Sequence, residues 1–469
     1  MRFRLNKDLL VKNMFNGDKL SHSPGNSIRL FPFVANRKDI KLVTDDLKDF
    51  RGIAGACFRE CLQLNQSNIF DKTTFINDVC EKANAKDNPD LKELIEKMAF
   101  NEKGQLVLFD TQIYPYVRNG NVNKTLNDIA KFIIAIYFDE DDRASLKKLT
   151  DSDPENLFYK LILSCIKKPE PGINNLEPYY QASSDLRKQF KNDLHTLISD
   201  KDLFVDQFHQ LIKFYFFKYT SELALRLNMF FGEEPAPLYF SVKWEKLQGA
   251  RASLKFGWDL FEANISPLFS HVIVLELINY IDGFAEQPVA YREIKEIVLH
   301  LDAQEQDNLM VCIDEVIELY RFGKQDVNWD NFRETIPSAE QNPILAKIRL
   351  LYQMIEYQFE ESSRGRAKLA YQEWLWEFTK INFTKPRGKW GNSLALGQEY
   401  VLLLTRLCVG SNEKIRLKDL WAGFQARGVL LDSISRDHII QYFDKINLLE
   451  KKSDSGDAQY IRKFSQTLA

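Results

Sequence analysis

The residues best suited to bind a polyanion lie in one short stretch near the C-terminal end. No acidic residue occurs between Glu377 and Glu399, whereas basic and aromatic residues are frequent there. The candidate nucleic-acid contacts in this stretch are Lys385, Arg387, Lys389 and Trp390. Cations can neutralise phosphates, and an indole ring can stack on a base. Because proline and glycine disfavour a helix interior, residues 381–397 are predicted to form a basic linker. A solvated linker without a ligand is the alternative.

The tail that follows, residues 398–469, predicts the elements that would position these side chains. Helical spacing of apolar residues ends at Gly410, and a short extended run over residues 415–417 precedes a second helix. Asp432 can cap a third helix, and residues 449–462 have the pattern of a hairpin. The order helix, strand, helix, helix, hairpin predicts a winged helix, which is a variant of the helix-turn-helix.

The outer face of the predicted third helix is poorly suited to a DNA groove. Winding this helix with Ile439 and Phe443 inward exposes Asp437 and Asp444, which phosphates would repel. We therefore expect it to dock a protein, through the candidate residues His438, Gln441 and Lys445. The wing adds two further candidate nucleic-acid contacts, Lys451 and Lys452, and two opposing acids, Asp454 and Asp457.

A second kind of chemistry is conceivable further upstream. Asp282 followed by the triplet Glu293-Ile294-Lys295 could bind Mg²⁺ and position a water for phosphodiester cleavage. Such a site prefers the triplet on a strand, whereas the apolar spacing from Tyr291 to His300 predicts a helix. A Mg²⁺-dependent nuclease therefore remains the alternative function. A DNA-binding regulator that reads DNA through the third helix is a further alternative, disfavoured by its aspartates.

The sequence contains no recognised catalytic or nucleotide-binding motif. There is no P-loop, HExxH, GxSxG or kinase signature, and no histidine pair has metal-ligand spacing. We therefore expect a non-catalytic chain without a metal or cofactor. The six cysteines are scattered, which favours reduced thiols and a cytoplasmic location. The apolar segment from His209 to Phe231 carries four charges, so it predicts an amphipathic core helix and no membrane contact.

Length and periodicity predict several mainly helical parts. With 469 residues, a net charge of −3 and a pI of about 6.2, the chain exceeds the size of one core and carries no overall basic charge. The predicted fold is mainly α, with a multi-helical body, a small mixed α/β N-terminal part and a C-terminal winged-helix-like domain. The expected regions are residues 1–170, 171–380, the basic linker 381–397, and 398–469.

The C-terminal region resembles a known family. The segments concerned are Ser363-Arg364-Gly365-Arg366, the aromatic helix around Trp374, Lys414-Ile415-Arg416-Leu417-Lys418-Asp419-Leu420, and the stretch from Asn447 to Tyr460. They are similar to the DptG (DndG) family of phosphorothioation-dependent DNA restriction systems. The resemblance covers about the last hundred residues, and the run from Glu450 to Tyr460 is its most specific part. Over the preceding residues it rests on length and helical texture.

The resemblance implies a bacterial defence protein that works with two ATPase subunits, DptF-like and DptH-like. Together such subunits restrict DNA that lacks the sulfur-modified backbone. The resemblance supplies no catalytic residue for this chain. It therefore agrees with the absence of an ATPase or hydrolase motif, and it implies a structural subunit that bridges the ATPase partners and DNA.

Overall fold

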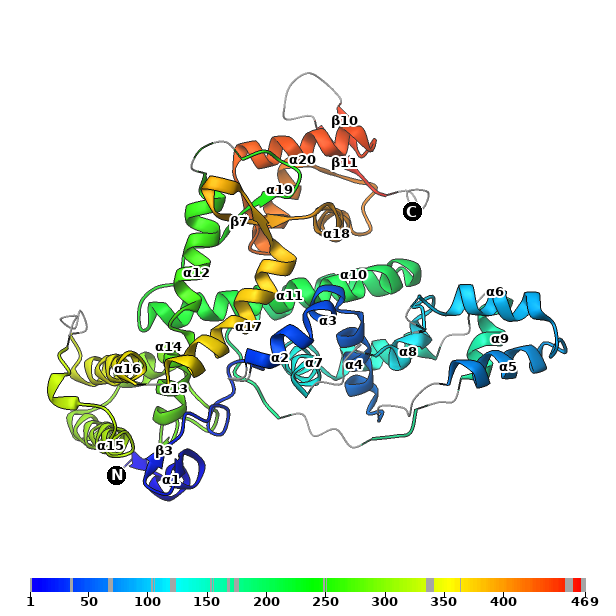
Figure 1. Ribbon diagram of the computed structural model, residues 1–469. Coiled ribbons are helices and arrows are strands. Elements are labelled where there is room, and N and C mark those ends of the chain that lie inside the picture. The colour runs from blue at the N-terminus through cyan, green and yellow to red at the C-terminus, as the bar shows by residue number, and fades with distance from the viewer. Residues whose placement is uncertain are drawn as a thin grey trace.

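The protein is built around one long helix. The computed structural model describes the whole chain except residues 1, 34–36, 66–70, 103, 105, 119–123, 152–153, 155, 167–168, 173–176, 248, 250, 335–340, 363, 452–458 and 465–469. Helix α11 (Lys201–Met229) has 29 residues and runs through the middle of the molecule (Figure 1). It is buried on every side rather than on one face, so the expectation of an amphipathic helix was wrong.

The charged residues of α11 are accommodated by specific partners. The Nζ of Lys213 donates to the backbone carbonyl of Lys48 over 2.6 Å. Lys218 lies 3.7 Å from Glu222, and Arg226 donates to the same carboxylate over 2.8 Å. A buried ammonium is stable only when it is paired in this way, which explains how a charged helix can occupy the core.

Short helices surround the first half of α11 (Figure 1). They are α2 (Arg37–Leu42), α3 (Thr44–Asp49), α4 (Arg51–Leu62), the 3₁₀ helix η1 (Thr111–Tyr116), α7 (Lys124–Tyr137), α8 (Glu140–Thr150) and α10 (Ser184–Ile198). Gly55 of α4 faces the backbone of Val117 so closely that a side chain would not fit, which accounts for the small residues of this helix. The acidic run after Phe138 is not a loop, because Asp139 and Asp142 form the capping box of α8.

Three more helices form a satellite core at one end of the molecule (Figure 1). They are α5 (Lys72–Lys82), α6 (Pro89–Ala99) and α9 (Leu157–Cys165). Their buried residues include Phe75, Ile95 and Ile162. Leu106 and Phe100 form an isolated antiparallel bridge beside these helices.

At the other end, a layer of helices holds the N-terminal arm. The layer consists of α12 (Leu260–Ile265), α13 (Leu268–Ile278), β5 (Ile281–Asp282), α14 (Tyr291–Val298), α15 (Ala303–Phe322), η3 (Trp329–Asn331), α16 (Pro343–Glu361) and α17 (Gly365–Phe383). The arm consists of β1 (Arg4–Leu5), α1 (Lys7–Met14), β2 (Phe15–Asn16) and β3 (Lys19–Leu20). Strand β1 pairs with β5, and Glu276 of α13 is buried and accepts backbone N–H groups of Gly25 and Ser27 at 2.9 Å.

The sequence did not reveal a four-stranded sheet beside α11. Its strands are β4 (Tyr239–Val242), β6 (Thr384–Pro386), β7 (Asn392–Leu396) and β9 (Leu430–Leu431), in the order β6-β7-β4-β9. Strand β4 is parallel to β7 and β9, and β6 is antiparallel to β7. A π-helix, η2 (Leu254–Asp259), packs on this sheet through Gly257, whose Cα faces the carbonyl of Tyr239.

The C-terminal module, residues 398–464, contains the expected sequence of elements. These are α18 (Gln398–Val409), β8 (Lys414–Arg416), α19 (Leu417–Ala426), α20 (Ser433–Lys445), β10 (Leu449–Lys451) and β11 (Gln459–Arg462), with β9 inserted before α20. Strand β11 lies between β10 and β8, antiparallel to both. The antiparallel strands predicted near Leu449 and Arg462 are confirmed by this pairing.

The regions expected from the sequence share one core. Buried apolar residues form a continuous cluster from Phe3 to Ile461. At the expected boundary between residues 170 and 171, Pro171 forms a bridge with Leu64, and the expected linker 381–397 contributes two strands to the sheet. The molecule is mainly helical, as predicted.

In the described residues no single helix is long and apolar enough to cross a membrane, although Leu254–Ile265 and Leu268–Ile278, bent by 50° at their junction, would pass that test together.

Candidate nucleic-acid interface

The basic stretch is a folded hairpin rather than a linker. Helix α17 continues to Phe383, whose ring stacks on Phe217 of α11 with centroids 4.4 Å apart. Strands β6 and β7 then pair with Lys385 opposite Ser393. Between them lies the 3₁₀ turn η4 (Gly388–Trp390), and we call residues 384–396 the β6–β7 hairpin. The sequence was read as a linker because its proline and glycines mark a turn as well as a loop.

Three of the four predicted contacts lie exposed on this hairpin. Lys385 and Lys389 are exposed, and Trp390 retains 39% of its accessible surface. The Nζ of Lys389 lies 5.1 Å from the centroid of the Trp390 ring, so a cation and an aromatic face are presented together. In the part of the chain that the structure describes, neither lysine forms an ion pair with an acid. Their charges are therefore available to a ligand.

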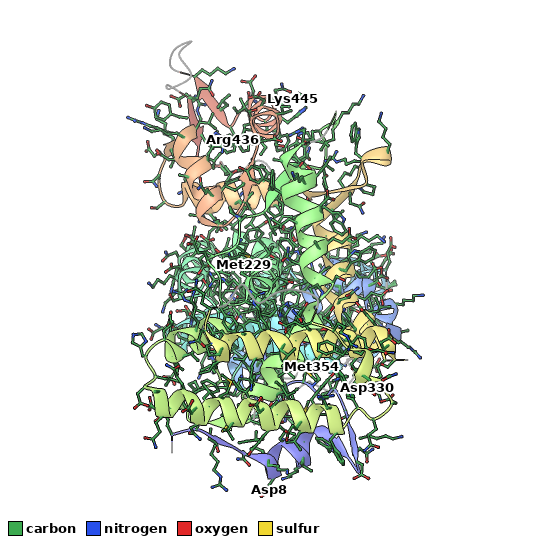
Figure 2. All side chains as sticks on the ribbon, turned by 90° about the vertical axis from the view of Figure 1, so that its left-hand side faces the viewer. Asp8, Met229, Asp330, Met354, Arg436 and Lys445 are labelled. Carbon is green, nitrogen blue, oxygen red and sulfur yellow. The ribbon has the colours of Figure 1, made fainter. Side chains whose placement is uncertain are left out.

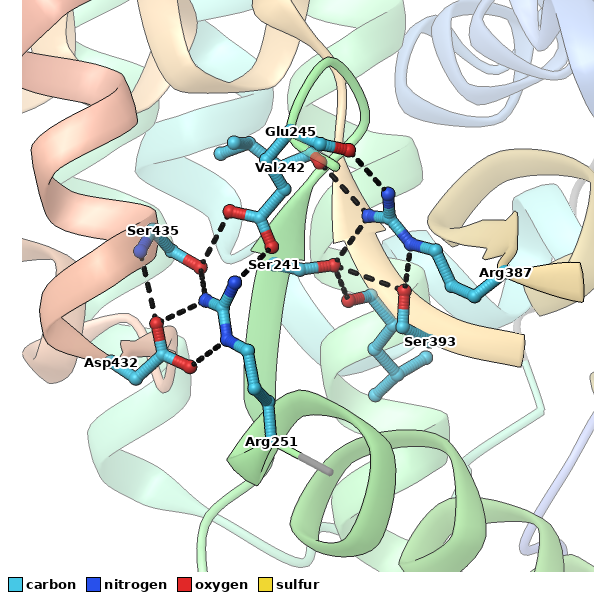
Figure 3. Close-up of polar contacts among 9 residues, drawn as sticks. Ser241, Val242, Glu245, Arg251, Arg387, Ser393, Asp432 and Ser435 are labelled. Carbon is cyan, nitrogen blue, oxygen red and sulfur yellow. Dashed lines mark hydrogen bonds and ion pairs between the residues drawn. The ribbon is translucent and has the colours of Figure 1, made fainter. Parts of the chain in front are cut away.

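The fourth predicted contact, Arg387, serves the fold instead (Figure 3). Its guanidinium donates to the Ser393 hydroxyl at 2.9 Å, to the Ser241 hydroxyl at 2.9 Å, and to the backbone carbonyls of Val242 at 3.0 Å and Glu245 at 2.7 Å. Four acceptors inside the protein leave little donor capacity for a phosphate. We therefore correct its assignment: Arg387 fixes the base of the β6–β7 hairpin to strand β4.

A second arginine holds helix α20 to the other side of β4 (Figure 3). Arg251 lies 3.1 Å from the carboxylate of Glu245 and donates to the carboxylate of Asp432, with its Nε at 2.8 Å. Asp432 is the N-cap of α20 and also accepts the backbone N–H of Ser435 at 2.9 Å. Burial raises the pKa of Asp432, but the hydrogen bonds from Arg251 and Ser435 outweigh it and lower that pKa below its usual value. The N-terminus of α20 is thus attached to the body.

The outer face of α20 is largely as predicted. Gln441, Asp444 and Lys445 are exposed, and Ile439 and Phe443 are buried. His438 is half-buried. Tyr442 packs on Trp244 of the body with ring centroids 5.3 Å apart. One side of the helix is therefore already covered, and the free face is that of Gln441 and Lys445, the latter at the extremity of the module (Figure 2).

The wing contributes less positive charge than its sequence suggests. Lys451 is exposed but lies 3.3 Å from the carboxylate of Asp444. Lys414 and Arg462 both bind Glu450, at 2.9 and 3.0 Å. Lys452 lies outside the described residues. Because these cations are paired with acids, the hairpin is the better polyanion contact in the described C-terminal region.

The residues of the alternative nuclease site are not assembled. Glu293 and Lys295 lie on helix α14 and border a cavity of about 780 Å³, but Asp282 pairs with Arg4 in β5 and does not line that cavity. Glu293 accepts the hydroxyl of Tyr180 at 2.9 Å, and Lys295 donates to the carbonyl of Phe231 at 2.6 Å. The two charged groups thus hold α14 to the segments that contain Tyr180 and Phe231.

The described residues contain no other arrangement suited to metal chemistry. None of their His, Cys, Asp and Glu side chains gather in a group of three or more that could hold an ion. Two of the buried histidines bind neutral partners or none: His271 contacts the hydroxyl of Tyr291 at 3.1 Å, and the Nδ1 of His209 has no partner. Burial lowers the pKa of both rings to about 3.

No protein-family model matches this sequence, and none of the curated proteins matches it either.

Sequence reasoning missed the residues that position the interface. Glu245, Arg251 and Ser241 lie about 140 to 190 residues from their partners along the chain. The only local signal was the alternation in Tyr239-Phe240-Ser241-Val242, which is typical of a short strand. Its pairing with β7 depends on tertiary contacts.

Proposed function

We propose that this protein is a non-catalytic subunit of a bacterial DNA restriction complex and that it binds DNA through the β6–β7 hairpin. In this proposal it acts in the cytoplasm with DptF-like and DptH-like ATPase subunits, on DNA lacking phosphorothioate modification. The observation that carries the DNA contact is the presence of Lys385, Lys389 and Trp390 on one hairpin, with both ammonium groups free of acidic partners among the described residues. The assignment to a restriction complex rests on the resemblance of the last hundred residues to the DptG family.

We further propose that the C-terminal module is a winged helix. The order α18, β8, α19, α20, β10, β11 supports this, as does the central position of β11 in a three-stranded antiparallel sheet. In a winged helix that reads DNA, the third helix would lie in the major groove. Here that helix exposes Asp437 and Asp444, so the module is better suited to a protein partner, which would contact Gln441 and Lys445.

The rigidity of the hairpin matters for its proposed role. A phosphate contact made by a mobile side chain on a mobile loop costs conformational entropy on binding. Arg387 and the strand pairing of β7 with β4 hold the turn in place before any ligand arrives. Non-specific contact with the phosphate backbone is the binding mode that two exposed lysines support best.

The test is salt-dependent binding of the full-length protein to a fluorescently labelled DNA duplex. Each phosphate contact contributes about −0.9 to the slope of log affinity against log salt, so replacing Lys385 and Lys389 by alanine should flatten the slope by roughly 1.8. Lys7→Ala with Lys12→Ala is the matched control, because both lysines are exposed on α1 at the opposite end of the molecule (Figure 2). Equal slopes for the two double variants would refute the DNA contact.

A nuclease activity is tested in the same preparation. Plasmid is incubated with the purified protein and Mg²⁺ or Mn²⁺. We expect no cleavage by the chain alone. Cleavage that is lost in Glu293→Ala but retained in Lys385→Ala would replace the proposed function by the nuclease alternative.

A further inference from the structure

A group of lysines from distant parts of the chain meets beside the β6–β7 hairpin. Lys243 follows strand β4 and donates its Nζ to the carbonyl of Asn382, in the last turn of α17, over 2.9 Å. The side-chain amide of Asn382 donates in turn to the carbonyl of Leu47, at the end of α3, over 3.2 Å. This chain of bonds brings Lys48 next to the segment that leads into Lys385.

The charges of neighbouring lysines affect the pKa values of Lys243 and Lys213. Burial lowers the pKa of Lys243, and the positive charges of Lys385 and Lys48 lower it further, while Glu399 opposes them. Burial likewise lowers the pKa of Lys213, to about 8, with Lys243 contributing in the same direction. Like charges held this close destabilise the unliganded protein unless an anion neutralises them.

The exposed members of the group have no acid to neutralise them. Within the described residues, neither Lys48 nor Lys385 takes part in an ion pair. Of the nearby acids, Asp49 lies 3.4 Å from Arg51 and also opposes the lowering of the pKa of Lys213. Glu399, at the start of α18, is the carboxylate that partly offsets the group.

We propose that Lys48, Lys243 and Lys385 form a lysine patch that binds the phosphate backbone of duplex DNA and continues the hairpin contact across the body of the protein. This proposal rests on the DNA contact proposed for the hairpin and extends it to Lys243 and Lys48, which precede Lys385 by 142 and 337 positions in the sequence. A strand held at the tip by Lys389 and Trp390 passes over Lys385 and then over Lys243 and Lys48. The chemistry that this patch recognises is a row of phosphates, because Lys48 and Lys385 are exposed cations and Lys243 keeps N–H donors beyond the one bound to Asn382.

The carboxylate of Glu399 opposes the positive charge of the lysine patch. A substitution that removes this carboxylate therefore tests the proposal through an increase in DNA affinity. Replacing Glu399 by glutamine removes one negative charge and keeps the shape of the side chain. If DNA phosphates occupy the patch, Glu399→Gln binds duplex DNA about threefold more tightly at low salt, the size of one screened surface charge interaction. A variant that merely disturbs the fold would not bind more tightly.

The complementary variant is Lys48→Gln. Lys48 is exposed and its ammonium holds no structural bond, whereas Lys243 caps α17 and its loss would also affect folding. Lys48→Gln should reduce the slope of log affinity against log salt by about 0.9. Lys12→Gln on α1 is the matched control and should leave the slope unchanged. The measurement is anisotropy of a labelled duplex with the full-length protein at several salt concentrations.

The outcomes separate this inference from the proposed function. If the hairpin variants weaken binding while Lys48→Gln and Glu399→Gln behave like the control, the lysine patch is refuted and the hairpin contact stands. If neither the hairpin nor the patch variants differ from the control, both proposals fail. A flatter slope in Lys48→Gln together with tighter binding in Glu399→Gln supports the patch.

Discussion

The guanidinium of Arg387 donates to the backbone carbonyl of Glu245 over 2.7 Å, and the carboxylate of Glu245 faces the opposite direction (Figure 3). That carboxylate accepts the hydroxyl of Ser435 at 3.0 Å and pairs with Arg251 at 3.1 Å. One residue therefore contacts both the base of the β6–β7 hairpin and the first turn of α20. Glu245 therefore helps to position both the proposed DNA contact and the proposed protein-docking helix.

The first prediction concerns Arg387. Arg387→Ala removes four hydrogen bonds and leaves the buried hydroxyls of Ser241 and Ser393 with fewer partners. We expect the free energy of unfolding to fall by about 2–3 kcal/mol, because unsatisfied buried polar groups cost that much. Lys385→Ala, two positions away but exposed, should change it by less than about 0.5 kcal/mol. Urea unfolding followed by tryptophan fluorescence measures both. Equal stabilities would show that Arg387 does not anchor the hairpin.

The second prediction concerns the ion pair between Arg427 and Asp193. It joins the C-terminal module to α10, and both side chains are at most 6% exposed. The Nε of Arg427 donates to Asp193 over 2.8 Å, and the hydroxyl of Tyr215 donates to the same carboxylate. Removing one partner leaves the other charge buried and unpaired. Arg427→Met alone should therefore lower the free energy of unfolding by about 3–5 kcal/mol.

The double variant supplies the control for this ion pair. Arg427→Met combined with Asp193→Leu leaves no unpaired charge, and we expect it to be more stable than either single variant. The measurement is a double-mutant cycle on the free energy of unfolding. Additive losses from the two substitutions would contradict the prediction, since they would mean that the two side chains do not interact in solution.

These cases show what the sequence could and could not predict. Helical periodicity identified the helices of the C-terminal module, because an amphipathic pattern is a local property. It failed for β4 and β7, which are short and buried by partners about 150 residues apart in sequence. It also assigned Arg387 to a ligand, since a basic residue in a glycine-containing turn has the same local sequence whether it faces solvent or a buried serine.

Some residues of the candidate site could likewise be identified from the sequence, and others could not. The exposed cations Lys385 and Lys389 could be selected from composition alone, because the absence of acids over some twenty residues is visible in the sequence. Lys48 and Lys243 could not, because only tertiary structure brings α3 and the end of β4 to the hairpin. The pairing of Lys451 with Asp444 was likewise hidden.

The third prediction is an acid-dependent loss of stability from buried histidine. Burial lowers the pKa of His271 from 6.5 to about 3, so the folded protein keeps this ring neutral while the unfolded chain protonates it. Between pH 6.5 and 3 the unfolded state binds more protons, and the free energy of unfolding falls as the pH falls, by about 1.4 kcal/mol per pH unit for one group. Above pH 6.5 this contribution is constant.

The substitution that tests this is His271→Gln, whose amide can still meet the hydroxyl of Tyr291. Whatever its effect on stability at neutral pH, it should make the pH dependence of the free energy of unfolding shallower by about one proton in the acid range. The same substitution at the exposed His300 is the control and should keep the slope of the parent protein. An unchanged slope in His271→Gln would mean that the ring is already accessible to protons in the folded state.

The last prediction separates the two faces of the C-terminal module. Gln441 and Lys445 lie on the free face of α20, away from the contact between Tyr442 and Trp244. Lys445→Glu adds to the acidic character of Asp437 and Asp444, and if the helix lay in a DNA groove it would weaken duplex binding strongly. Because we propose that α20 binds a protein, we expect Lys445→Glu to cause little change in the salt-dependent affinity for DNA. We expect instead that Gln441→Arg and Lys445→Glu weaken co-purification with the ATPase subunits proposed as partners, because a protein interface is sensitive to an unpaired charge at its centre. Ser433→Glu, exposed at the N-terminus of the same helix, is the matched control, since an acid there agrees with the helix dipole. Loss of DNA binding in Lys445→Glu with partner binding intact would assign α20 to DNA and reverse the roles proposed for the helix and the hairpin.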